Sequence, residues 1–261
     1  NTVCAANKAL YQPIQAIYAA NLQATSDITT LTDLSAYTAN NVQTCIGQDG
    51  NGWGNFLYKT IGTSGIYSLT CVGAQLGMVS LRKVSESIAY NEVSNLSNGS
   101  EMAVPAFCNG QLVSALSASA LAALDTKRYV FPITYTGYVG TFFSGSNMAV
   151  APTSDYANME NNRTICKAER NLYLSYVPKL NAPITFNSDG TLTDQFVAQF
   201  EGIGNSALDQ MVRDGELSAK SVKINPSQNV LANNALTVAV VLVINGVARN
   251  ININIGFKPS I

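Results

Sequence analysis

Residues 235–257 read Ala-Leu-Thr-Val-Ala-Val-Val-Leu-Val-Ile-Asn-Gly-Val-Ala-Arg-Asn-Ile-Asn-Ile-Asn-Ile-Gly-Phe. The first ten of these residues, 235–244, are nearly all apolar, which predicts a strand buried on both faces of a sheet. Asn245-Gly246 is the strongest short signal for a hairpin turn. Residues 249–257 then alternate apolar side chains with asparagine, as in a strand with one apolar face. The stretch therefore predicts a C-terminal β-hairpin.

Two helices and a strand are predicted before this hairpin. The helix over 155–177 has Ser154 as its cap and ends at Pro178, which cannot continue it. A second helix follows an approximate capping box at 191–194. Gly202 and Gly204 within this second helix are expected to bend or break it. The strand follows over 217–225 and ends before Pro226.

The first 150 residues also predict a mixture of helices and strands. The helices are expected at 5–20 (interrupted by Pro13), 66–82 and 111–125, and the strands at 41–47, 129–135 and 139–144. Helices grouped with antiparallel strands favour an α+β fold, with a mixed β-sheet flanked by helices. We expect an N-terminal part over 1–150 and a C-terminal domain over 151–261, with one continuous domain as the alternative.

The composition excludes several classes of function. The chain has 261 residues, of which 47% are hydrophobic, so it can bury a sizeable core. Charged residues make up 12% and the net charge is −1, without the basic footprint that nucleic acid or an anionic membrane requires. There is no histidine, which excludes catalytic triads, metal sites and proton shuttles that need an imidazole from this chain. No apolar run approaches the length of a membrane span.

The five cysteines are scattered without the spacing of a zinc or redox site. We expect buried, reduced thiols. A secreted protein with one or two disulfides is the alternative, and Asn95, Asn98 and Asn162 match the glycosylation pattern that an Asn-rich chain also produces by chance. The N-terminal residues lack the pattern of a signal peptide. Because residue 1 is not methionine, the chain is expected to be a fragment or a processed product.

No motif predicts catalysis or a cofactor. Asp49 begins a stretch like a calcium loop, but Trp53 and Thr60 stand where ligands belong, so a tight turn is favoured. No phosphate-binding loop follows these glycines. A hydrolase using two carboxylates is a further alternative, for which the sequence shows no constellation. We therefore predict no catalytic, cofactor-binding or metal-binding residue, and no enzyme.

Two sets of residues are candidates for a subunit interface. On the helix over 155–177, charged residues form either a solvated face or a contact surface. The terminal strand either belongs to its own sheet or adds to the sheet of another chain, where the backbone supplies affinity and alternate side chains supply specificity. It lacks the usual protection of an edge against pairing. The candidates are Glu160, Arg163, Lys167 and Arg170 on the helix and Arg249, Ile251, Ile253, Ile255 and Phe257 on the strand.

Several segments, by their order and spacing, resemble a known family. They are Ile46-Gly47-Gln48-Asp49-Gly50, Val72-Gly73-Ala74-Gln75-Leu76-Gly77, Val84-Ser85-Glu86-Ser87-Ile88-Ala89, Ser154-Asp155-Tyr156-Ala157-Asn158-Met159-Glu160-Asn161-Asn162-Arg163, Ile224-Asn225-Pro226-Ser227-Gln228-Asn229-Val230-Leu231 and the strands over 235–257. In this order they resemble the contractile tail sheath proteins of bacteriophages and phage-derived injection systems, in the branch found in prophage-like elements. The likeness extends from about residue 40 to 257.

This resemblance implies a structural role without enzymatic activity. Such subunits stack as rings around a tail tube, and contraction drives the tube through a cell envelope. The implied partners are further copies of the chain, the tail tube protein, and the baseplate and tail terminator proteins, with no nucleic acid and no membrane insertion. The implied locations are the bacterial cytoplasm during assembly and then the virion tail or injection particle.

By the same resemblance, residues 247–257 form the C-terminal arm that adds a strand to a neighbour, or the strand beside it. The helix over 155–177 would face the tube or an adjacent subunit. A matching N-terminal arm is not evident. The alternative function is a secreted adhesin or pilus-type subunit that is assembled by strand exchange, which shares the low charge and the β-rich end.

Overall fold

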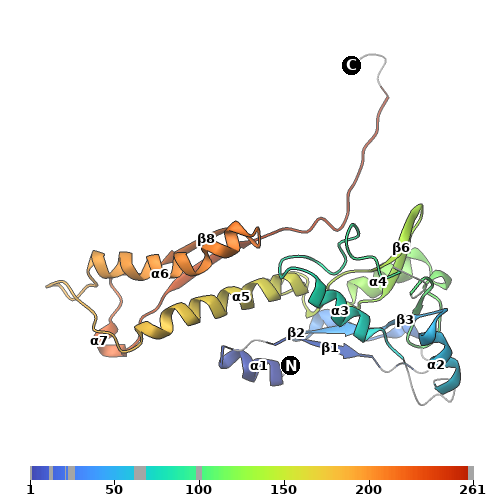
Figure 1. Cartoon of the computed structure of the whole chain (residues 1–261), viewed down its shortest axis with the longest axis horizontal. Helices are drawn as coiled ribbons and strands as arrows, with labels where there is room; N and C mark the ends of the chain where they lie inside the picture. The colour runs from blue at the N-terminus through green and yellow to red at the C-terminus, as the bar shows by residue number, and fades with distance from the viewer. Residues whose placement is uncertain are drawn as a thin grey trace.

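The computed structural model describes residues 2–11, 14–20, 22, 27–61, 69–97 and 102–257. The molecule is elongated, and the helix α5 (Met159–Tyr176) connects an N-terminal body to a C-terminal lobe (Figure 1). The last described residues leave that lobe and extend away from both parts as an isolated, extended segment (Figure 1). Within the described residues, no helix is both long and apolar enough to cross a membrane.

The N-terminal body is built on a mixed three-stranded sheet in the order β1-β2-β7. β1 (Ala16–Ala19) runs parallel to β2 (Thr38–Cys45), and β7 (Met148–Val150) runs antiparallel to β2. Two antiparallel pairs adjoin this sheet, and helices flank it. The pairs are β3 (Gly47–Asp49) with β4 (Pro105–Phe107) and β5 (Pro132–Tyr135) with β6 (Tyr138–Phe143); the helices are α1 (Thr2–Ala9), α2 (Trp53–Ile61), α3 (Val72–Leu81) and α4 (Ala118–Thr126).

Large apolar side chains fill the hydrophobic core of this N-terminal body. Ile46, Phe107, Phe131 and Phe143 are each at most 1% exposed, and burial of such side chains is the main favourable term in folding. All five cysteines are free thiols and four of them are buried. The predicted strands over 41–47, 129–135 and 139–144 are present with shifted ends.

Several predicted helices are shorter than expected. The predicted helix over 5–20 ends at Ala9, and its later part is wrong at residues 16–19, which pair with β2 as β1. Residues 12–13 lie outside the described residues. The helix over 66–82 begins at Val72, with residues 66–68 outside the described residues. The helix over 111–125 begins at Ala118, after the short 3-10 turn Val113–Ala115.

The C-terminal lobe packs two long helices on one face of a strand pair. After α5 come the 3-10 turn Val177–Lys179, α6 (Asp194–Arg213), β8 (Leu217–Lys223), α7 (Val230–Asn233) and β9 (Ala239–Ile244). Thr193 caps α6 by accepting a hydrogen bond from the Phe196 N–H. Asn158, rather than the predicted Ser154, stands at the cap position of α5, because the Ser154 hydroxyl accepts the Tyr156 N–H in the preceding turn.

Gly204 keeps α6 close to its neighbours instead of breaking it. The helix is continuous from Asp194 to Arg213, so the predicted bend or break at Gly202 and Gly204 is wrong. A Cβ atom at Gly204 would collide with the Tyr176 hydroxyl and with the Val222 side chain. A glycine here therefore lets α5, α6 and β8 approach one another.

The α+β class and the mixed sheet flanked by helices are confirmed, and the chain has a C-terminal strand pair. The predicted hairpin between 235–244 and 249–257 is wrong, because β9 pairs antiparallel with β8, in the register Val222↔Val240. The predicted burial of β9 on both faces is also wrong, since Val241 and Val243 are 63% and 50% exposed. The division into 1–150 and 151–261 stays a prediction.

Candidate subunit interface

Residues 245–257 form no helix or strand in this structure. We call residues 250–257 the tail; Figure 1 shows it as an extended trace that leaves the molecule. Its four large apolar side chains are exposed: Ile251 81%, Ile253 78%, Ile255 84% and Phe257 101%. The tail carries no charged residue and no proline. An extended, apolar and uncharged segment of this kind is a template for pairing with another strand.

Arg249 anchors the base of the tail to the N-terminal body. Its Nη2 donates to Asp125 Oδ1 at 2.7 Å and to the carbonyl of Ser144 at 3.0 Å. Asn147, which is fully buried, donates to the same Asp125 Oδ1 at 2.8 Å and fixes the carboxylate. At Gly145, a Cβ atom would lie 2.8 Å from Arg249 Nη2, so a larger residue there would displace the end of the arginine side chain.

These anchors explain why Asn245-Gly246 does not form the predicted hairpin turn. The Asn245 amide donates to the carbonyl of Gly215, and its oxygen accepts from the Ser218 hydroxyl at 2.8 Å. Asn245 is thereby held along the start of β8 while Arg249 is drawn to Asp125. The two tertiary anchors therefore override the local turn signal, and the tail leaves the molecule instead of folding back on β9.

The strand pair β8–β9 supplies a complementary surface. Lys220, Val222, Val240 and Leu242 face α5 and α6, with Lys220 pairing to Asp209 of α6 at 2.6 Å. The opposite face carries the exposed valines of β9. β8 pairs with one edge of β9, and no strand in the described part of the chain pairs with its other edge. β9 contains no charged residue to protect that edge.

Among the predicted charged residues of α5, Glu160 lines the same pocket as Arg249 and Ile251 at the base of the tail. The charged residues of α5 mostly serve the chain itself. Glu160 is 3% exposed. Arg163 donates to the carbonyls of Arg82 and Lys83, which ties α5 to the end of α3. Lys167 pairs with Glu216 at 2.6 Å. Arg170 is exposed, so of the four it is the most accessible to another subunit.

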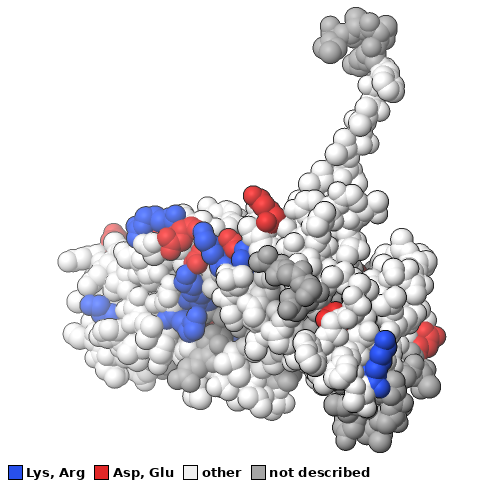
Figure 2. Space-filling view, turned by 45° about the vertical axis from the view of Figure 1, so that its right-hand side comes forward, with Lys and Arg blue, Asp and Glu red and all other residues white. Residues whose placement is uncertain are grey.

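Charged side chains are distributed unevenly over the surface. Figure 2 shows them gathered over the lobe that contains α6, whereas the tail and most of the body are uncharged in that view. Part of this cluster consists of ion pairs between α6 and β8, Asp209 with Lys220 and Glu201 with Lys223. These pairs stabilise the lobe locally. The tail is therefore suited to apolar and backbone contacts.

The described residues contain no group of His, Cys, Asp or Glu that could hold a metal ion. In the stretch that resembles a calcium loop, the Asp49 Oδ1 accepts the Asn51 N–H at 3.0 Å, and α2 begins at Trp53. This is a turn that leads into a helix. The turn expected from the sequence at this point is confirmed.

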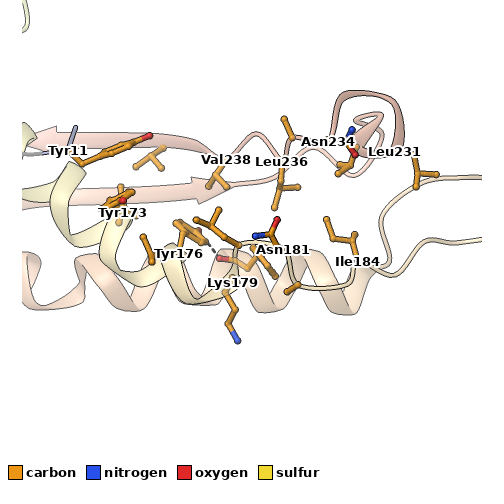
Figure 3. A pocket seen from close by; sticks show the side chains of 18 of the residues that line it. Tyr11, Tyr173, Tyr176, Lys179, Asn181, Ile184, Leu231, Asn234, Leu236 and Val238 are labelled. Carbon is orange, nitrogen blue, oxygen red and sulfur yellow. Dashed lines mark hydrogen bonds between the residues drawn. The ribbon is translucent and has the colours of Figure 1, made fainter. Parts of the chain in front are cut away.

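The sequence did not reveal an apolar groove at the far end of the lobe. It is lined by residues from α5, from 180–186, from α7 and from the start of β9 (Figure 3). Because these segments lie far apart in the chain, no local pattern could have identified it. The only available signal was the apolar stripe of α5.

We expect Arg249→Ala to release the base of the tail. The ion pair with Asp125 is partly exposed, so its loss should lower the free energy of unfolding by only about 0.5–1 kcal/mol. Limited digestion with subtilisin should cleave faster between residues 245 and 250. Arg249→Lys should restore little of the protection, because lysine lacks the planar fork of donors. Unchanged cleavage in the alanine variant would contradict the anchoring.

Glu160 is expected to destabilise the fold at neutral pH. Burial raises the pKa of its carboxyl, and the Ser146 hydrogen bond only partly offsets this. Its Oε2 has no hydrogen-bond partner within the described structure. The folded state therefore binds the proton more tightly, and stability falls as pH rises above the ordinary pKa of 4.5 towards the raised one.

Glu160→Gln should accordingly raise the urea midpoint at pH 7, and the gain should shrink towards pH 4. The control is Asp155→Asn, which removes a carboxylate that is exposed instead of buried. Parallel pH profiles for the two variants would contradict this account of Glu160.

Comparison with known proteins gives two family matches and several likenesses of fold. Residues 1–147 match the family model described as "DUF2586, N-terminal domain", and residues 155–260 match "DUF2586, C-terminal domain". No curated protein matches the sequence.

Two solved structures contain chains of similar fold. A chain of the "Cryo-EM structure of the anti-feeding prophage (AFP) baseplate, 6-fold symmetrised" is 12% identical with a TM-score of 0.60, and the match covers 97% of this chain and 63% of that one. A chain of the "Cryo-EM Structure of an Extracellular Contractile Injection System, PVC sheath complex in contracted state" is 14% identical with a TM-score of 0.62, over 95% and 65%. This chain thus spans just under two thirds of the length of each.

Proposed function

This chain is a member of the DUF2586 family, and we propose that it is a structural, non-enzymatic subunit of a phage-derived contractile injection system. The likeness of its fold to chains of an injection-system baseplate structure and of a sheath complex supports this proposal. At the finer level, we propose that it is a tail sheath subunit, which polymerises helically around a tail tube and contracts to drive the tube through a cell envelope.

The observation that carries the proposal is a donor and an acceptor for strand addition in one molecule. The tail presents an exposed, alternating, uncharged segment, and β9 presents an open, uncharged edge. Strand addition uses main-chain hydrogen bonds for affinity and alternate side chains for specificity. Because donor and acceptor are different surfaces, the contact is head-to-tail, and such contacts generate rings or helical filaments.

Strand addition between subunits is compatible with two states of the sheath, one before and one after contraction. A tail anchored at Arg249 and held by a neighbour through its backbone acts as a tether between subunits. Other contacts between the subunits can slide while the tether persists, as in transitions where packed elements move past one another. Under this proposal, the energy for contraction is stored in the assembled sheath, and no nucleotide is consumed.

The proposed partners are further copies of this chain, a tail tube protein, and the baseplate and tail terminator proteins. The proposed locations are the bacterial cytoplasm during assembly and then the virion tail or injection particle. The low share of charged residues suits a surface that other subunits cover.

Negative-stain electron microscopy of the full-length protein tests the function. The protein is imaged alone and after mixing with its tube protein, with the tube protein by itself as the control. We expect hollow sleeves or tubes with a striated coat. Dispersed particles under both conditions would contradict the sheath proposal.

A further inference from the structure

Two cysteines that lie far apart in the sequence come together in the N-terminal body. The sulfur of Cys45, at the end of β2, lies 3.7 Å from the sulfur of Cys71, which immediately precedes α3. Because the two residues are 26 positions apart, no local spacing could have identified the pair. In the described part of the chain, no other two cysteines are in hydrogen-bonding contact.

The main chain holds the two residues side by side. Cys45 belongs to the central strand of the sheet, which has β1 and β7 as its neighbours. The Cys71 N–H donates to the carbonyl of Gly47 at 2.7 Å, close to Cys45 in the chain. Residues 69–71 form no helix or strand, so the Cys71 side has more freedom to adjust. A disulfide bond is about 2.05 Å long, and the sulfurs therefore need to approach by only about 1.7 Å.

The two thiols differ in their access to solvent and in their acidity. Cys45 is fully buried, whereas Cys71 is partly exposed, so a small oxidant reaches Cys71 first. The hydrogen bond with Cys71 lowers the pKa of the Cys45 thiol. Because the thiolate is the attacking species in disulfide exchange, Cys45 is suited to attack a Cys71 sulfur that has already reacted.

We propose that Cys45 and Cys71 form a reversible disulfide, which acts as a redox-sensitive clasp between β2 and α3. The oxidant is a small disulfide such as glutathione disulfide. The Cys71 thiolate attacks one of its sulfurs, a mixed disulfide forms and one glutathione leaves. Cys45 then attacks the Cys71 sulfur, the bond between the two cysteines forms and the second glutathione leaves. The cysteines thereby lose two electrons and two protons, which the two glutathione thiols carry away.

The clasp would fasten a helix that the body covers only in part. The Gln75 amide of α3 donates to the Gln43 side-chain oxygen of β2 at 2.6 Å, but Leu76 and Leu81 of α3 are 56% and 68% exposed. A bond at the start of α3 closes the loop 45–71 and restricts the unfolded chain. The clasp stays open where thiols are kept reduced and closes under oxidising conditions.

Mass spectrometry of the full-length protein tests the clasp. The protein is incubated overnight with excess glutathione disulfide, because the hydrogen bond to Cys45 raises the pKa of Cys71 and slows the first attack. It is then unfolded and alkylated, and we expect three alkylated cysteines in place of five. Trypsin cleaves after Lys59 and Arg82, so the bond should link the peptide 9–59 to the peptide 60–82.

The thermal midpoint gives a second readout. Oxidation should raise the midpoint by on the order of 5 °C, and a reductant should reverse the shift. Cys71→Ser should abolish both the linked peptide and the shift. The matched control is Cys166→Ser, which removes a buried thiol on α5 and should retain both. Each shift is measured against the reduced form of the same variant, so a change in its overall stability does not obscure the result.

Five alkylated cysteines after oxidation, or one glutathione retained on Cys71, would overturn the proposal. A bond from Cys45 to Cys108 would also overturn it. Cys108 is the alternative partner, since its N–H donates to the carbonyl of Ile46 at 2.8 Å, but burial raises the pKa of its thiol to about 12. The experiment uses the unassembled subunit, so its failure would leave the sheath proposal standing.

Discussion

Removal of residues 247–261 is expected to abolish assembly while leaving the subunit folded. The apolar side chains of the tail are 78–101% exposed and contribute little to the core of their own chain. The anchor that the deletion removes is the partly exposed Arg249–Asp125 pair, worth about 1 kcal/mol or less. Analytical ultracentrifugation should show only small species, and the thermal midpoint should change little.

A second variant separates loss of the tail from loss of its apolar face. Replacing Ile251, Ile253 and Ile255 by serine keeps the length and the backbone of the tail but removes the side chains that the neighbour would bury. Assembly should be lost in this variant too. Intact sleeves from the truncated chain would refute the role of the tail.

Leu208→Ala is expected to destabilise the C-terminal lobe strongly. Leu208 is fully buried between α5, α6 and the strand pair. Truncation of a buried leucine removes apolar burial and leaves a cavity, which together cost about 2–5 kcal/mol. Because the strand pair is covered by helices on one face only, little else holds β9 in place. We expect a large fall in the urea midpoint and a loss of assembly.

The control is Leu231→Ala, at a leucine that is 70% exposed. It should change stability by less than about 0.5 kcal/mol, as surface substitutions usually do. Similar urea midpoints for the two alanine variants would contradict the packing described for α6.

Local sequence signals were sufficient where the structure depends on neighbouring residues. The helix α6 begins within the predicted capping stretch 191–194, where Thr193 is the cap, and β8 lies where the strand over 217–225 was expected. The apolar pattern over 235–244 identified β9, although the strand proved to be covered on one face only. These features depend on helix capping and on side-chain periodicity, which a single sequence contains.

Sequence reasoning failed where distant residues compete with a local preference. Asn245-Gly246 is a strong turn signal, but Gly215, Ser218 and Asp125 bind the residues around it. Similarly, Gly204 would break an isolated helix, whereas here it lets Tyr176 approach. The burial of Glu160 also had no local signal, because its position on α5 suggested a solvated face.

Hydrogen exchange of the tail amides tests the central claim, that subunits are joined by strand addition. In the isolated subunit, the amides of residues 250–257 should exchange at the rate of an open chain. In assembled sleeves every second amide of the tail should be protected at least about tenfold, because the alternate N–H groups that point towards the neighbouring strand would then be hydrogen-bonded. The exposed turn at Thr136 and Gly137, between β5 and β6, serves as the internal control. Equal exchange of the tail in subunits and sleeves would contradict the account.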